Sequence, residues 1–130
     1  CSAIQLSDGT MITAGSSVLL GTCASLLLNA LKHLAGIDHS VKLISQDFIE
    51  PIQKTKVDYL GGNNPRLHMD EVLVALSVLS LNDVNCRRAL AMLPELNGLQ
   101  AHATVMLSQV DQKIMKKLGI LLTCDPAAKK

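Results

Sequence analysis

Aromatic side chains are almost absent from this sequence. Its 130 residues include one Phe, one Tyr and no Trp, although 48% of them are hydrophobic. Proteins that bind single-stranded nucleic acids stack the bases on aromatic side chains along basic grooves, and here the formal net charge is only +1. Nucleic acid is therefore not an expected partner. The length suits a single domain, whose core has to be built from aliphatic residues and methionine.

Paired cysteines and membrane-spanning runs are also lacking. Cys1, Cys23, Cys86 and Cys124 lie far apart and no signal peptide precedes them, which indicates a reducing cytoplasm where buried cysteine packs as a small hydrophobe. The longest apolar run, 18–31, is about fourteen residues long, whereas a helix that spans a bilayer needs about 20. We expect a cytoplasmic domain without membrane contact. Because the chain opens at Cys1 directly in a strand-like pattern, we expect it to come from a longer protein.

Strand and helix patterns alternate along the chain. Asp8 and Gly9 between two alternating runs predict a β-hairpin of 3–7 and 10–13. The further expected strands are 41–45, 99–108 and 120–123. We expect a first helix with apolar positions from 19 to 34, and a second from 46 to near Gly61 with Pro51 in its first turn. A third helix should follow His68, and two more should cover 84–93 and 111–118.

This order predicts an α/β fold. Strands interleaved with helices favour a three-layer α/β/α sandwich with helices on both faces of the sheet, and the initial hairpin makes that sheet mixed. We expect one domain over 1–126, followed by a disordered tail at 127–130.

Six segments carry a resemblance to a known family: AIQLSDGTMIT, LLNALKHLAGID, LISQDFIEPIQKTKV, LGGNNPRLHMDEVLVALS, LPELNGLQAHATVMLS and KLGILLTC. They are similar to the C-terminal domain of the bacterial family known as domain of unknown function 1846, and together they cover essentially the whole chain. The resemblance implies a cytidine-deaminase-like topology. It also implies a longer protein, whose N-terminal part has a glycine-rich GPGSGK-like loop suggestive of phosphate binding.

A deaminase-like fold raises the possibility of catalytic zinc. That chemistry requires an H-x-E motif and a P-C-x-x-C motif, and neither occurs in this sequence. We therefore expect a deaminase-like fold without the zinc site, with no metal and no cofactor in this domain. The resemblance assigns any bound nucleotide to the longer protein. It implies a lysine in the loop after the second strand, where this chain has Ala14, Gly15 and Ser16, so an anion contact is not carried over.

A polar cluster precedes the helix that follows His68. Asn64, Arg66 and His68 stand where free backbone N–H groups and the helix dipole favour an anion. Arg66 could bind a carboxylate or phosphate, and His68 could donate a hydrogen bond or move a proton. The alternative is structural, because Asp70 and Glu71 in the first turn would complement the dipole, cap the helix and pair with Arg66.

A second set of polar residues lies on the penultimate strand. His102 and Thr104 share one face of it, and ligands of open α/β sheets gather at the carboxyl ends of strands. This predicts a pocket that combines Arg66, His68, His102 and Thr104. The alternative is that these groups are hydrogen-bonded beneath a helix or face water. Ser16 and Ser17 form a weaker candidate for an anion-binding helix start, since serine is also the ordinary N-cap residue.

No complete catalytic set is visible in these residues. We expect an uncharacterised accessory domain for ligand binding, docking or oligomerisation, whose main partner is the N-terminal region of the same bacterial protein and which can form homo-oligomers. One alternative is a composite active site of a nucleotide- or phosphate-dependent enzyme, with Arg66, His68 and His102 contributed by this domain. Another is a purely structural interface, which predicts an exposed apolar patch.

Overall fold

A four-stranded mixed sheet forms one side of the molecule. The computed structural model describes residues 2–15, 20–62, 65–104 and 107–124. Strands β1 (Ser2–Gln5), β2 (Met11–Ala14), β3 (Gln100–Ala103) and β4 (Leu121–Cys124) lie in the order β2-β1-β3-β4. β1 is antiparallel to β2 and β3, and β3 is parallel to β4. The expected α/β fold with a mixed sheet is confirmed.

Local residues explain the hairpin of β1 and β2. Gly9 has a φ of 91°, a backbone conformation that glycine adopts without a steric cost. The Asp8 side chain accepts a hydrogen bond from the Thr10 N–H at 2.9 Å, which stabilises the turn. The predicted hairpin is confirmed.

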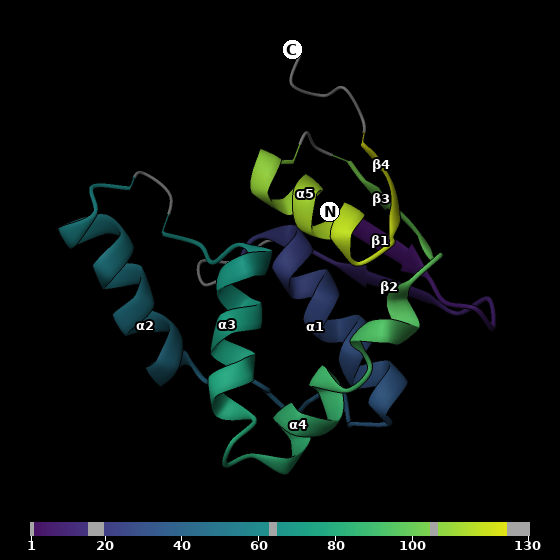
Figure 1. Cartoon of the computed structure of the whole chain (residues 1–130), viewed down its shortest axis with the longest axis horizontal. Helices are drawn as coiled ribbons and strands as arrows, with labels where there is room; N and C mark the ends of the chain where they lie inside the picture. The colour runs from purple at the N-terminus through teal and green to yellow at the C-terminus, as the bar shows by residue number, and fades with distance from the viewer. Residues whose placement is uncertain (1, 16–19, 63–64, 105–106, 125–130) are drawn as a thin grey trace.

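The described residues include five α-helices: α1 (Thr22–Ala35), α2 (Gln46–Lys54), α3 (Met69–Leu79), α4 (Val84–Leu90) and α5 (Gln109–Lys117). A π-helical turn, η1 (Thr55–Tyr59), continues α2, and a 3₁₀ turn, η2 (Leu93–Leu96), follows α4. α1 contacts β1 and β2, α5 contacts β4, and α3 contacts both α1 and α5. Figure 1 shows α2 standing apart at the outer edge of α3. In the part of the chain that the structure describes, no helix has the length and hydropathy needed to cross a membrane.

The core lies between the helices and one face of the sheet. Ile4, Ala101 and Ala103 of the sheet are buried there against residues such as Leu26 and Met115 of the helices. Their strand neighbours Gln5, Gln100 and His102 point the other way and are exposed, so the described residues form two layers. The second helical layer of the expected three-layer sandwich is not found among them, because every described helix that contacts the sheet packs on this core-facing side. The deaminase-like topology stays a prediction.

The strand expected at 41–45 is wrong. Leu43 and Ile44 are buried, which explains the apolar pattern, but the segment pairs with no described strand. Its carbonyl groups bond to side chains instead: the Val41 oxygen accepts from Lys32 Nζ at 3.0 Å, and the Leu43 oxygen accepts from Cys86 Sγ at 3.1 Å. Pro51 lies inside α2 rather than in its first turn. The tail predicted at 127–130 lies outside the described residues.

Candidate functional site

The uncovered face of the sheet, here called the open sheet face, carries seven exposed strand side chains. They are Gln5, Met11, Thr13, Gln100, His102, Leu121 and Thr123. Met11 is 56% exposed and Leu121 is 59% exposed. Successive side chains of a strand point to opposite faces, so the buried residues of the same strands pack on the helices while these seven face away from them.

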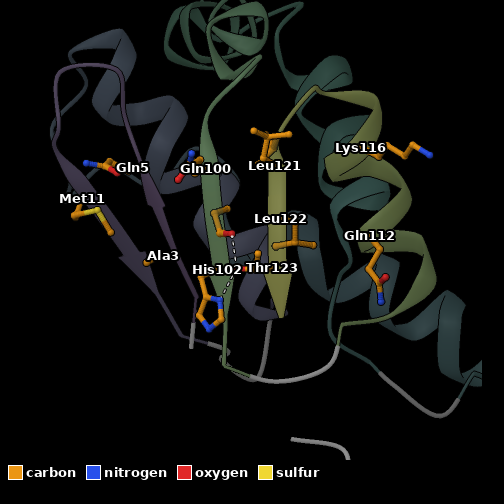
Figure 2. Close-up of a pocket in the computed structure, with 12 residues that line it drawn as sticks. Ala3, Gln5, Met11, Gln100, His102, Gln112, Lys116, Leu121, Leu122 and Thr123 are labelled. Carbon is orange, nitrogen blue, oxygen red and sulfur yellow. Dashed lines mark hydrogen bonds between the residues drawn. The ribbon is translucent and has the colours of Figure 1, made fainter. Parts of the chain in front are cut away.

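A hollow of about 700 Å³ lies on this face. Besides the strand residues, Gln112 and Lys116 of α5 line it along the side of β4 (Figure 2). Gln112 is held in place because its Nε2 donates to the Leu107 carbonyl oxygen at 2.8 Å. The hollow therefore combines side-chain amides and a lysine cation with apolar surface, a mixture typical of ligand sites.

His102 and Thr123 form a bonded pair within this hollow. They are register partners on the parallel strands β3 and β4, and His102 Nδ1 lies 2.6 Å from Thr123 Oγ1 (Figure 2). Thr123 Oγ1 also donates to the Ala101 carbonyl oxygen at 3.4 Å. The bond between the side chains fixes the imidazole ring. An activated hydroxyl nucleophile needs a base that a third group orients, and no carboxylate occurs among the described residues that line the hollow.

The start of α3 is held by carboxylates. Glu71 Oε1 accepts the backbone N–H of His68 at 2.8 Å and a hydrogen bond from Lys56 Nζ at 2.9 Å. Lys56 also donates to the Arg66 carbonyl oxygen at 2.7 Å. Lys56 therefore joins η1 to the first turn of α3.

Asp111 completes this arrangement from α5. Its side chain is buried and accepts the Met69 N–H at 3.0 Å, while its own N–H donates to Ser108 Oγ at 3.2 Å. The Asp70 carboxylate accepts the Glu71 N–H at 2.9 Å. Because carboxylates already occupy these helix-start N–H groups, the geometry favours the capping alternative over an anion site here.

The hollow on the open sheet face does not bring Arg66, His68, His102 and Thr104 together, and their roles in ligand binding stay predictions. His102 lines the hollow on the open sheet face, and neither Arg66 nor His68 does. His68 is the N-cap of α3, which packs on α1 and α5 in the helical layer. Thr104 is exposed just beyond β3. The candidates Asn64, Ser16 and Ser17 lie outside the described residues.

Several residues of the hollow were not predicted. Thr123, Gln112 and Lys116 come from the last helix and strand, in which the sequence pointed to no site residue. The alternation of Leu121 to Cys124 could have placed Thr123 on an exposed face, but only the register shows that it meets His102.

Cys23 and Cys86 have the properties of packing residues. Burial, and then the nearby Asp111 and Cys124, raise the pKa of the Cys23 thiol to about 12. Burial, with a contribution from Asp83, raises the pKa of Cys86 to about 11. Neither thiol is a nucleophile at neutral pH, because the reactive species is the thiolate. In the described ranges, no three His, Cys, Asp or Glu side chains gather in a way that could hold a metal ion.

Comparison with known proteins identifies relatives of unknown function. The family model described as domain of unknown function DUF1846, C-terminal, matches residues 1–130. A UPF0371 protein of Corynebacterium aurimucosum is 56% identical over 124 residues, which are 95% of this chain and 25% of the relative. A UPF0371 protein of Corynebacterium diphtheriae is 52% identical over 128 residues, which are 98% of this chain and 26% of the relative.

The similarity extends beyond Corynebacterium. A UPF0371 protein of Streptococcus thermophilus is 44% identical over 124 residues, with 95% of this chain and 25% of the relative covered. The chain thus spans about a quarter of the length of these relatives. With a match over its whole length, the chain belongs to the DUF1846 family, as a C-terminal domain of that family.

Proposed function

We propose that this chain is an accessory domain of a longer protein and that the rest of that protein packs on its open sheet face. The observation that carries the proposal is the parallel pair of β3 and β4 with one face uncovered. Sheets made only of parallel strands are nearly always covered on both faces, whereas antiparallel sheets can leave one face in water. In this mixed sheet, the parallel pair therefore favours a second covering layer over β3 and β4. About three quarters of the length of the relatives lies outside the matched region. That part of the longer protein is available to cover the face.

The side chains of the face fit such a contact. Leu121 and Met11 are large apolar groups that expose more than half of their surface, and a neighbouring layer would remove that surface from water. His102, Thr123 and Lys116 would then line an enclosed hollow. A lysine cation beside hydrogen-bonding groups suits a small anionic ligand, such as a carboxylate or phosphate compound. The domain would therefore both dock and complete a binding site.

The experiment compares two aspartate substitutions in the full-length protein. Leu121→Asp would bury a charge in the contact and lower the melting temperature by several degrees, since an unpaired buried charge is strongly destabilising. Val110→Asp is the matched control, because Val110 is 43% exposed and does not line the hollow. Equal melting temperatures for the two variants would contradict the proposal and would leave the face open to water.

A further inference from the structure

A second exposed apolar surface lies on the helical side, between α2 and α3. A groove of about 610 Å³ runs there, here called the α2–α3 groove. Its lining residues are Asp47, Phe48, Pro51, Ile52, Asp70, Glu71, Val74, Ala75, Val78 and Leu79. Figure 1 shows the two helices side by side at the edge of the molecule, away from the sheet. The groove is therefore distinct from the open sheet face.

The groove leaves large hydrophobic side chains in water. Phe48 is 52% exposed, Val74 is 66% exposed and Val78 is 60% exposed. Of the residues of α2, only Ile49 is buried. Helices of globular proteins bury their apolar stripe against a neighbour, and contiguous exposed apolar surface marks an interaction site. Among the described residues, α2 therefore makes few contacts that explain why it lies beside α3.

The shape of the groove suits an α-helix. Val74 and Val78 are four residues apart, so they stand one turn apart on the same side of α3. Phe48 and Ile52 repeat that spacing on α2, the opposite wall. A groove with two helical walls accepts a third helix whose apolar side chains recur every three or four residues.

The charges of the groove specify the polar side of that helix. Asp47 and Asp70 line it, and Glu71, the third acid, is paired with Lys56 at 2.9 Å. None of the described lining residues is a lysine, arginine or histidine. Opposite charge on a partner would be attracted to this surface, and like charge would be repelled.

We propose that the α2–α3 groove holds an amphipathic, basic α-helix supplied by the remainder of the longer protein. The remainder is long enough, because the chain spans about a quarter of its relatives. A second copy of this chain fits less well, since a two-fold contact sets a surface against itself and would bring Asp47 and Asp70 against acids. The inference depends on the domain being part of a longer protein, and it is independent of how the open sheet face is used.

The test measures side-chain protection by hydroxyl-radical footprinting of the full-length protein. Phe48 and Tyr59 are the aromatic residues of the chain; Phe48 lines the groove and Tyr59, 72% exposed, does not. We expect Phe48 to be protected from oxidation and Tyr59 to be oxidised rapidly. Oxidation of both residues in proportion to their exposure here would overturn the proposal. Protection of Phe48 that disappears on dilution would overturn it too, in favour of a second copy.

Matched charge variants test the basic character of the helix. Asp47→Lys would repel it and restore the oxidation of Phe48, and Asp47→Asn would do so in part. Glu50→Lys is the control, because Glu50 is an exposed acid of α2 that does not line the groove. Equal effects at positions 47 and 50 would overturn the proposal. The same experiment measures the oxidation of Leu121. If Leu121 is protected and Phe48 is oxidised, only the proposal for the α2–α3 groove is refuted. If both residues are oxidised, docking on either surface is refuted.

Discussion

At the start of α3, hydrogen bonds to single side chains join this helix to its neighbours. Asp111 belongs to α5 but accepts the N–H of Met69, the first residue of α3. The Glu71 carboxylate receives the His68 N–H and the Lys56 ammonium group. The sequence predicts Glu71 near a helix start. It does not predict the hydrogen-bond partners, because Asp111 is separated from Met69 by 42 positions and Lys56 from Glu71 by 15.

Replacement of Asp111 should reveal this role. Asp111→Ala would leave the buried Met69 N–H without its acceptor, and we expect the free energy of unfolding to fall by about 1–3 kcal/mol. Asp111→Asn keeps an acceptor oxygen and should cost less. Urea unfolding measures both, with the exposed Asp58→Ala as a control that should have almost no effect. If the alanine and asparagine variants were equally unstable, the hydrogen bond to Met69 would not be the cause.

At the scale of elements, the turn from α5 into β4 is tightly packed. Gly119 has a φ of 81°, and its carbonyl oxygen accepts the Gly98 N–H at 2.8 Å. A Cβ at Gly119 would collide with the side-chain amide of Asn97 and lie 3.2 Å from the Asn97 Cα. The turn thereby fixes where β4 starts beside β3, and so helps to bring Thr123 to His102.

Alanine substitutions should separate backbone strain from this contact. Gly61 has a φ of 71° but open space around it, so Gly61→Ala carries only the cost of the left-handed conformation, about 1–2 kcal/mol. We expect Gly119→Ala to lower the free energy of unfolding by about 1–3 kcal/mol more, because of the collision. Adding Asn97→Ala should recover part of that difference in a double-mutant cycle. Equal losses at positions 61 and 119 would contradict the tight packing.

At the scale of the whole molecule, the two buried thiols couple stability to alkaline pH. Their ordinary pKa is 9.0, and burial raises it to about 12 for Cys23 and about 11 for Cys86. Above pH 9 the unfolded chain loses thiol protons that the folded chain retains, so the free energy of unfolding falls from pH 9 up to the folded-state pKa values. Lys32 acts in the opposite direction, because burial lowers its pKa below 10.5 and the unfolded chain then binds more protons.

Cys23→Ala should therefore flatten the alkaline loss of stability. The variant has one thiol fewer to ionise in the unfolded chain, so its free energy of unfolding should decline less steeply between pH 9 and pH 11 than that of the parent protein. Urea unfolding at each pH gives the free energy of unfolding of both proteins as a function of pH. The slopes of these two curves are compared, not the absolute free energies. Parallel curves would show that Cys23 does not contribute.

The sequence by itself determined the local elements of this protein. The hairpin of β1 and β2 follows from Asp8, Gly9 and the alternating runs beside them, and α1 follows from a helical recurrence that ends at Gly36, the left-handed C-cap. Such features depend on neighbours within a few positions, so a single sequence contains them.

Only the tertiary structure decided which elements pair and which faces are covered. The apolar segment 41–45 resembles a strand in sequence, but its carbonyl groups accept hydrogen bonds from side chains of α1 and α4. His68 and His102 looked like partners, but one lies in the helical layer and the other on the open sheet face. Strand pairing and layer packing join residues far apart in the chain, and periodicity records only whether a residue is buried, not what buries it.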